Sequence, residues 1–395
     1  MNTTRRDFLK VGALLTLAAG APKLLVRSAL AAAPEKDKTI LIVLQLSGGN
    51  DGLNTVIPFA DDLYHQSRPT LRQVAAKAHH ISDQLAFHPR MEGFARLFAE
   101  GQLAVVQGVG FAKSDRNHPG AMHMWHTAEP QSPGPQTGWL GRAADQLWNP
   151  DAANLPAAFV GSIPQPFASN SARVIIPSIR AARDLVCPPA VTATAVGGAL
   201  LKCARRATAA ATANSAHIEA VLKSGAGDYP QFRLADELRT IAQLIRADTG
   251  IRIYFTELGG GGIGGFDNHA GQIGNHCSLL EQLSASLTAF TRDLQRDKLL
   301  DRVILMTYSE FGRTLHENGR RGTGHGAAQP VFVVGGKVKG GLVGAHPSLA
   351  DLDQDAQKVH TDFRRIYATM LDRWLGLDSR AILGNTYAPV DFLHT

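Results

Sequence analysis

The sequence predicts an α/β protein with an open, mostly parallel sheet and helices on both faces. The first observation is the apolar, β-branched run "TILIVLQL" at 39–46, which is typical of a strand that is covered on both sides. The second is the amphipathic helical pattern "FRLADELRTIAQLIRAD" at 232–248. The third is the alternation of such strands and helices along the chain, which favours parallel strands joined by right-handed crossovers.

The remaining elements continue this alternation. Residues 88–101 place apolar side chains at helical spacing, and "LAVVQGVG" at 103–110 predicts a strand. Further along, a strand at 251–258 precedes a helix at 279–295, and "DRVILMTY" at 301–308 predicts another strand. Each of these strands is largely apolar, as expected of the interior of a sheet.

The segment at about 150–229 differs from the rest of the chain. It is rich in Ala, interrupted by Pro and short of long aliphatic runs. We expect it to form an insertion or cap on the sheet and not an independent domain. The chain has 395 residues, 44% of them hydrophobic, which is enough for one large core, and we expect one domain over 38–395.

The N-terminal residues 1–31 have the pattern of an export signal. A basic start with Arg5 and Arg6 is followed by a short apolar stretch and the small-residue sequence "ALA" at 29–31. The core "TRRDFLK" is typical of a twin-arginine signal, which the twin-arginine translocation machinery recognises. A basic membrane anchor is the alternative, but the apolar stretch is short for a span. We expect a periplasmic or secreted protein without a membrane span in its mature chain.

The charge balance does not favour a nucleic-acid partner. The formal net charge is +6. Five basic residues and one acidic residue in the first 31 positions account for +4 of it, which leaves +2 for the rest of the chain. A protein that binds a phosphate backbone usually carries a much larger positive excess.

The stretch "GGFDNHAGQ" at 264–272 contains an aspartate and a histidine two residues apart, Asp267 and His269. In an extended segment, side chains at this spacing leave the backbone on the same side, so both can reach one metal ion. The alternative is a polar surface turn, because Gly, Asp and Asn are common turn residues.

Similar polar clusters directly follow other predicted strands, and one histidine precedes the apolar run "VFVVGG". In open α/β sheets, ligands bind beyond the carboxyl ends of the strands, so we expect these clusters to meet at one edge. Carboxylates combined with imidazoles suit Zn²⁺ or Mn²⁺ better than Ca²⁺. The set allows one or two ions, and two would form a clamp for attack on a phosphorus or sulfur centre. The candidate metal ligands are Asp51, Asp267, His269, Glu310 and His325.

Several longer motifs resemble a bacterial family. They are the twin-arginine start, "LQLSGGNDGLNTVIP", "GGFDNH", "YSEFGRTLHENGRRGTGHG" and "GGKVKGGLVGAHP", in this order. By these motifs the sequence is identified as a member of the exported family called domain of unknown function 1501, in the alkaline-phosphatase-like superfamily. The resemblance covers nearly the whole mature chain. It implies an alkaline-phosphatase-like fold and a metal-dependent phosphatase or sulfatase.

The order of the five candidate ligands also matches the metal-binding residues that this superfamily implies. Two neighbouring positions depart from the pattern. Phe311 stands where a histidine of a second metal site is expected, which weakens that site. Gly324 stands where the family usually has an aspartate before the late histidine, a change that affects at most the surroundings of the ligands.

The helix predicted at 114–130 is where the resemblance implies a nucleophilic Ser or Thr. Relatives tend to have Ser-His-Phe there, whereas this chain has Asn117, His118 and Pro119. An amide cannot attack a phosphorus centre, so catalysis would use the Ser114 hydroxyl or a metal-activated water. The displacement of Ser114 by three residues favours water. His118 is the best functional histidine of this helix, against the alternative of a structural hydrogen bond.

The motif "SEFGRT" adds Arg313, whose planar guanidinium is suited to a tetrahedral oxyanion, against the alternative of a structural ion pair. Together these residues predict an exported hydrolase of small anionic phosphate or sulfate esters. The rival hypothesis is a non-catalytic exported protein of the same fold that binds a surface or periplasmic partner. Asn117 at the expected nucleophile position favours the rival.

The first prediction concerns export. Changing Arg5→Lys together with Arg6→Lys should keep the precursor in the cytoplasm, because lysine lacks the planar fork of the paired guanidinium groups. Cell fractionation and immunoblotting would measure this. Periplasmic accumulation of the double variant at the wild-type level would disprove the twin-arginine assignment.

Overall fold

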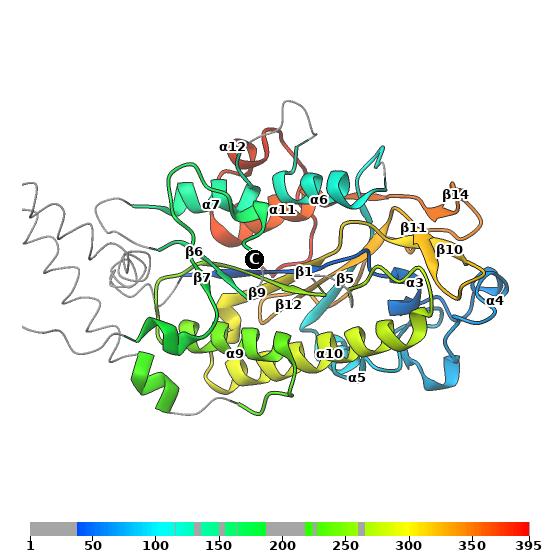
Figure 1. The fold of residues 1–395 in the computed structure, drawn as a ribbon, viewed down its shortest axis with the longest axis horizontal. Helices are drawn as coiled ribbons and strands as arrows, with labels where there is room; N and C mark the ends of the chain where they lie inside the picture. The colour runs from blue at the N-terminus through cyan, green and yellow to red at the C-terminus, as the bar shows by residue number, and fades with distance from the viewer. Residues whose placement is uncertain are drawn as a thin grey trace, which may run out of the picture.

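A computed structural model describes residues 38–114, 116–129, 136–149, 155–162, 164–186, 218–223, 227–259 and 265–394. The predicted signal at 1–31 and the middle of the predicted insertion at 150–229 lie outside these residues. A central sheet lies between two layers of helices, with a group of short strands and helices beyond one end of the sheet (Figure 1).

The central sheet confirms the predicted fold class. Its strands are β1 (Ile40–Leu46), β5 (Leu103–Gly110), β6 (Ala157–Val160), β7 (Ser178–Ile179), β8 (Ile253–Leu258), β9 (Val303–Tyr308), β12 (Gln329–Gly335), β13 (Gly341–Val343) and β16 (Thr361–Asp362). Their order is β13-β5-β12-β9-β1-β8-β6-β7, and β16 pairs with β5. Among the described strands of the central sheet, only β12 runs antiparallel to its neighbours, β5 and β9. The sheet is therefore mostly parallel.

The longer helices cover both faces of the sheet (Figure 1). One face carries α5 (Glu92–Ala99), α9 (Arg233–Arg246) and α10 (Gln272–Arg296). The other carries α6 (His118–Thr127), α7 (Trp139–Leu147), α11 (Phe363–Ala368), the π-helix η6 (Thr369–Leu375) and α12 (Ser379–Leu383).

Shorter elements complete the described chain. The small strands are β2 (Val56–Ile57), β3 (His79–His80), β4 (Ala86–Phe87), β10 (Arg313–Glu317), β11 (Thr323–His325), β14 (Leu352–Asp353) and β15 (Ala356–Gln357). The small helices are α3 (Gly52–Thr55), α4 (Asp62–Ser67), η2 (Ala75–Lys77), η3 (Phe167–Ser169), η4 (Ala182–Leu185) and η5 (Leu300–Arg302).

The strand β1 is the centre of the hydrophobic core. It pairs in parallel with β8 on one side and β9 on the other, and all seven of its residues are buried. Ile42 and Leu44 face the core beneath α9 and α10, and Leu41 and Val43 face the core beneath α6 and α11. Full burial of each such side chain stabilises the fold by about 1.5–3 kcal/mol. The continuous apolar run is therefore explained by two separate cores.

One predicted boundary needs correction. The helix predicted at 279–295 begins seven residues earlier, because its first turns bury the polar side chains of Gln272 and His276. An apolar periodicity does not reveal such turns. Within the segment predicted as an insertion or cap, at about 150–229, β6 and β7 extend the central sheet beside β8.

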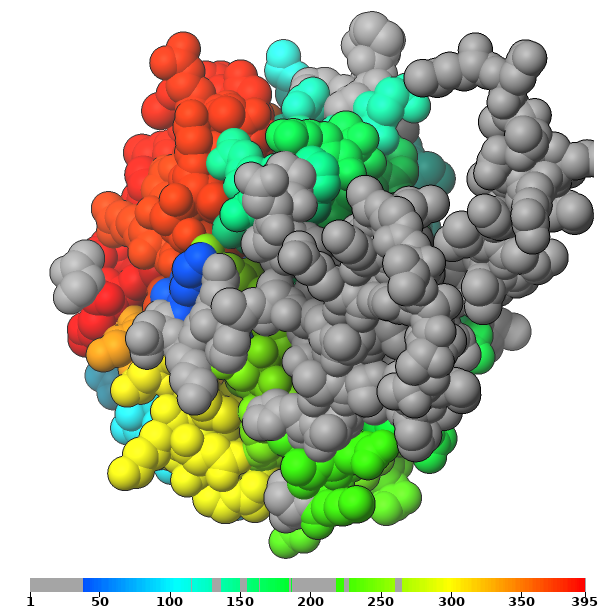
Figure 2. Space-filling view, turned by 90° about the vertical axis from the view of Figure 1, so that its left-hand side faces the viewer, coloured from blue at the N-terminus to red at the C-terminus, as the bar shows by residue number. Residues whose placement is uncertain are grey.

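The beginning of the described chain lies against its C-terminal part. Figure 2 shows the blue residues that precede β1 between the red C-terminal helices and the yellow part of the chain around α10. Thr39 Oγ1 donates to the Trp374 carbonyl at 2.6 Å, and Arg302 Nε donates to the Lys38 carbonyl at 3.1 Å. None of the described helices combines the length and the apolar character that a membrane crossing requires.

A buried histidine gives this fold a testable pH dependence. His126 of α6 donates from Nε2 to Gln45 Oε1 at 2.8 Å, and burial lowers the pKa of His126 to about 4. A histidine of the unfolded chain titrates near 6.5, so between these values the unfolded state binds a proton that the folded state does not. The free energy of unfolding should therefore fall as the pH drops from about 6.5 towards 4.

The expected contribution of His126 between pH 7 and pH 5 is about 2 kcal/mol. Urea denaturation of the wild type and of His126→Asn at both pH values measures it. The variant should be less stable at pH 7 and should lose about 2 kcal/mol less on acidification. Equal losses in the two proteins would contradict the assignment of a neutral buried His126.

Candidate functional site

Three of the residues at the edge of the sheet form a cluster that is suited to a metal ion. His118 is the first residue of α6, Asp267 lies in the loop after β8, and His325 ends β11. One nitrogen or oxygen atom from each lies within 4.8 Å of the others. The side chains are 37%, 42% and 21% exposed, so the cluster is open to solvent.

Both histidines of this cluster have Nδ1 held by an acceptor. His118 Nδ1 lies 2.9 Å from Glu310 Oε1, and His325 Nδ1 lies 2.6 Å from the Arg116 carbonyl oxygen. Because a carbonyl and an ionised carboxylate only accept, each Nδ1 carries the proton. The two Nε2 atoms lie 3.3 and 3.2 Å from the carboxylate of Asp267, to which they donate when the rings are protonated. In the neutral rings Nε2 carries a lone pair instead, and this tautomer is typical of histidines that ligate a metal through Nε2.

His269 lies beside these atoms, as the stretch "GGFDNHAGQ" predicted. Its Nε2 is 2.9 Å from Asp267 Oδ1 and 3.0 Å from His325 Nε2. Two ring nitrogens at this distance share at most one proton in neutral histidines. The structure thus brings Asp267, His269 and His325 together with His118.

Glu310, a predicted metal ligand, is a buried carboxylate that orients His118. The Gly48 amide donates to both of its oxygens at 2.9 and 3.0 Å, and the Ser309 hydroxyl donates to Oε2 at 3.2 Å. Burial raises the pKa of Glu310, but the hydrogen bonds from His118 and Gly48 outweigh it, so the pKa is lowered. In turn, the hydrogen bond to Glu310 raises the pKa of His118 against the effect of burial.

Only glycine fits at position 48, because the chain there passes close to the backbone of Asp267. The φ of Gly48 is +118°, and a Cβ atom there would lie 2.5 Å from the Asp267 backbone nitrogen. A larger residue would displace the loop that carries Asp267. The glycine pair after the first predicted strand therefore serves the close packing of two site loops.

Arg313, the predicted oxyanion donor, is engaged with the protein itself. Its side chain is 1% exposed. It donates to the carbonyl oxygens of Gly49, Phe266 and Thr323 at 2.7, 3.0 and 3.3 Å, and to that of Gly48. It also donates to Asp267 Oδ1 at 2.7 Å. Burial raises the pKa of Asp267, but Arg313, together with the neighbouring His269 and His118, outweighs this effect, so the pKa is lowered.

Asp51, also a predicted ligand, belongs to a separate buried group. Its Oδ2 accepts from Arg68 at 2.6 Å and from Gln272 Nε2 at 2.5 Å. Burial raises the pKa of Asp51, but Arg68, His276 and Gln272 together outweigh it, so the pKa is lowered. No motif of the sequence identifies Arg68 or Gln272 as a partner of Asp51, because both residues meet Asp51 only through the tertiary fold.

The predicted nucleophile region forms the start of α6. Asn117 is the N-cap, and its Oδ1 accepts from the Gly120 amide at 2.8 Å. The Ser114 hydroxyl accepts from the Arg116 amide at 3.2 Å, within a local turn. Asn117 therefore uses its side-chain oxygen to stabilise the helix end.

Phe311, which replaces an expected histidine, forms an apolar wall of the cluster. It is buried, and its ring centroid lies 4.3 Å from that of His325 and 5.0 Å from that of His118. This wall excludes water from one side of the two histidines.

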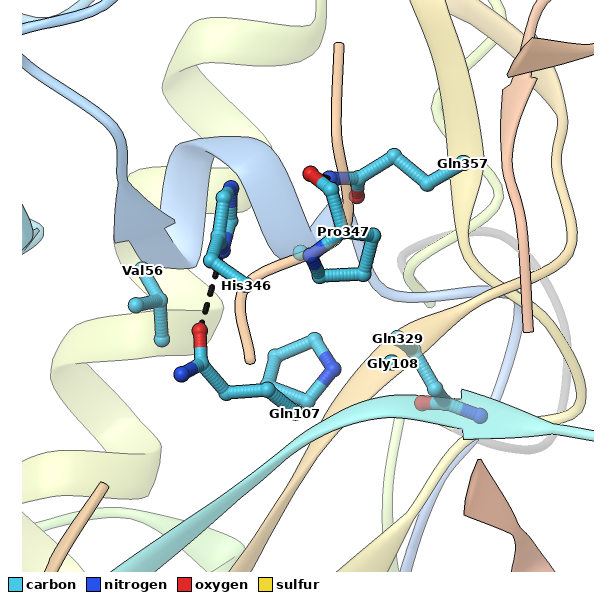
Figure 3. Close-up of a pocket in the computed structure, with 9 residues that line it drawn as sticks. Val56, Gln107, Gly108, Gln329, His346, Pro347 and Gln357 are labelled. Carbon is cyan, nitrogen blue, oxygen red and sulfur yellow. Dashed lines mark hydrogen bonds between the residues drawn. The ribbon is translucent and has the colours of Figure 1, made fainter. Parts of the chain in front are cut away.

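Two hollows lie apart from this cluster. Figure 3 shows a cavity of about 10 Å³ at which His346 contacts Gln107 Oε1 at 3.0 Å, close to Pro347 and Gln357. This volume is enough for about one water molecule. A surface hollow of about 780 Å³ lies between α5, α10 and residues 227–230, and none of the candidate site residues lines it.

No curated protein matches the sequence of this chain. Among solved structures, similarity extends to the C-terminal periplasmic domain of EcEptC from Escherichia coli in complex with Zn, with 10% identity, 77% of this chain and 75% of that chain covered, and a TM-score of 0.37. A protein in the alkaline phosphatase superfamily from Vibrio parahaemolyticus has 11% identity, coverage of 92% and 78%, and a TM-score of 0.38.

The PsFucS1 sulfatase from Pseudoalteromonas sp. is similar with 11% identity, coverage of 99% of this chain and 75% of that chain, and a TM-score of 0.40. Similarities this weak say nothing about the chemistry of the cluster. The family comparison is stronger: the model described as "Protein of unknown function (DUF1501)" matches residues 38–388. This chain therefore belongs to the family of proteins of unknown function DUF1501, as its motifs indicated.

Proposed function

We propose that this chain is a metal-dependent hydrolase of phosphate or sulfate esters that holds a divalent ion through His118, Asp267 and His325. The observation that carries the proposal is the orientation of the two histidines. Each directs its Nδ1 proton to an acceptor of the protein, and each turns Nε2 towards the same carboxylate.

The donor set fits Zn²⁺ or Mn²⁺. Two imidazole nitrogens and one carboxylate oxygen are typical zinc ligands, and three protein ligands are usual in catalytic sites. His269 is the candidate for a fourth ligand, since its Nε2 lies 2.9 Å from Asp267 Oδ1. Such an ion, when bound, polarises an ester oxygen and lowers the pKa of a water molecule.

The residues around the cluster have supporting roles in this proposal. Glu310 holds the Nδ1 proton of His118 and so fixes the orientation of that ring. Arg313 holds Asp267 in place from the buried side. Phe311 keeps water from the inner side of the rings, and the exposed side remains open to an anionic ester. Arg313 therefore acts as a positioning residue and not as a donor to the substrate.

We favour water as the nucleophile. The position where relatives carry a hydroxyl is filled by Asn117, whose oxygen caps α6. The Ser114 hydroxyl lies in the turn before the helix and accepts from Arg116. Near-attack geometry tolerates a displacement of only about 1 Å, which disfavours a hydroxyl three residues away.

The second candidate function is a non-catalytic exported protein that binds a surface or periplasmic partner. The capping role of Asn117 favours it, because a helix start built for capping needs no reaction at that position. For both candidates we propose a periplasmic or secreted location, reached through the twin-arginine machinery. That location rests on the sequence of residues 1–31.

Turnover of aryl phosphates and aryl sulfates separates these possibilities. The zinc- or manganese-loaded protein should hydrolyse at least one of them, and Ser114→Ala should retain the wild-type kcat, because water is the nucleophile. Loss of turnover in Ser114→Ala would refute the water mechanism. A gain in Asn117→Ser would indicate a site that has lost its nucleophile. If no variant turns over either ester class, the non-catalytic candidate is favoured.

Metal binding is tested independently of activity. Asp267→Ala combined with His269→Ala should abolish most zinc binding and most of the increase in melting temperature that zinc produces. A ligand at about 100 times its Kd stabilises the folded state by about 2.7 kcal/mol. Elemental analysis and thermal unfolding with and without zinc measure both effects.

A matched control is His316→Ala combined with Asp355→Ala. This pair also joins a histidine to an aspartate, at 2.6 Å, but lies at the surface, between β10 and the turn that joins β14 to β15. The control should keep the metal content and the zinc-dependent stabilisation of the wild type. Full metal content in the Asp267/His269 variant would instead mean that "GGFDNHAGQ" is only a polar turn.

A further inference from the structure

The Asp51 carboxylate is compensated by a buried arginine. Asp51 is 2% exposed and the Arg68 side chain is 0% exposed, and their closest nitrogen and oxygen atoms are 2.6 Å apart. Gln272 Nε2 donates to the same oxygen, Oδ2. The sequence predicted a metal ion beside this carboxylate, and the structure has a guanidinium there.

Arg68 is fixed in this position by two further hydrogen bonds. Its Nε donates to the Leu315 carbonyl at 2.9 Å, and its second terminal nitrogen donates to the Thr314 carbonyl at 2.8 Å. Both acceptors belong to β10. Because every side of the guanidinium is engaged, Arg68 cannot turn away from Asp51 without leaving these carbonyls unpaired in the interior.

The other ligand atoms that a second ion would need either accept hydrogen bonds from the protein or are missing. Both oxygens of Glu310 accept hydrogen bonds from the protein. Asn50 Oδ1 accepts from Thr55 Oγ1 and from His276 Nε2, each at 3.1 Å. Phe311 contributes a ring in place of an imidazole. Asp51 Oδ1 has no hydrogen-bond partner among the described residues, but one oxygen beside a guanidinium is a poor cation site.

We propose that Arg68 takes the place of a second metal ion as a fixed cation, so that the chain binds one divalent ion and not two. The proposal rests on the metal centre of the proposed function and concerns the number of ions. The pair is also connected to that centre. Thr323 Oγ1 donates to Gln272 Oε1 at 2.8 Å, and Arg313 donates to the Thr323 carbonyl as well as to Asp267.

The chemical reason is charge. An ionised Asp51 needs one compensating charge in the interior, and Arg68 supplies it without a metal. A divalent ion at the same carboxylate would lie next to a guanidinium that cannot lose its proton. Removing the guanidinium while keeping Asp51 should therefore open a position for an ion, with the Asp51 carboxylate and the released carbonyl oxygens of Thr314 and Leu315 as ligand atoms.

The test counts ions in the folded full-length protein. Wild type, Arg68→Met and Arg68→Met combined with Asp51→Asn are saturated with Zn²⁺, and in parallel with Mn²⁺, and freed of unbound metal. Elemental analysis then gives the ions per chain. We expect one ion per chain in the wild type, two in Arg68→Met and one in the double variant. In the double variant neither position 51 nor position 68 carries a charge.

The outcomes separate this proposal from the proposed function. Two ions in the wild type overturn the role of Arg68 and leave the metal centre standing. No ion in the wild type defeats both. A folded Arg68→Met that still binds one ion at saturation shows that Arg68 does not occupy an ion's place, and it overturns the proposal. Should Arg68→Met fail to fold, the wild-type count decides between one and two ions.

Discussion

The buried guanidinium of Arg313 holds together the loops that form the candidate site. It bonds to backbone carbonyls in the loop after β1, in the loop after β8 and at the start of β11, and to Asp267. A buried charge without partners is strongly unfavourable, so these acceptors and the guanidinium require each other. The position of Asp267, and with it the convergence of His118 and His325, depends on this one side chain.

Two buried arginines thus give two carboxylates different roles. Arg313 takes only one oxygen of Asp267, and the other oxygen faces His118 on a side chain that is 42% exposed. Arg68 and Gln272 enclose Asp51, which is 2% exposed. An aspartate that pairs with an arginine can still ligate a metal ion when solvent and other ligand atoms reach its second oxygen. An aspartate that the protein encloses on all sides has only a structural role in the interior.

The sequence was most informative where a residue's neighbours along the chain determine its environment. The runs at 39–46, 251–258 and 301–308 became β1, β8 and β9, because a strand covered on both faces must be apolar throughout. The strand-end argument also placed Asp267 and His269 at the same edge as His325, and they do lie together. Their role as metal ligands stays a prediction.

Other features depend on contacts between distant parts of the chain. Arg68 and Gln272 lie 17 and 221 positions from Asp51, and no local periodicity relates them. The orientation of His325 depends on the backbone carbonyl of Arg116, which any residue would provide. The first turns of α10 bury Gln272 and His276 against polar partners, so they lacked the apolar pattern that marks a helix.

The separation of the site residues along the chain has a consequence for the order of assembly. His118 and Glu310 are 192 positions apart, and His325 lies 58 positions beyond Asp267. Closing such long loops is slow and precedes any gain from the contacts they allow. The cluster is therefore complete only when β1, β8 and β9 have already paired. If the precursor crosses a membrane in its folded form, as we propose, the cluster is already complete in the cytoplasm, and the proposed ion can first bind there.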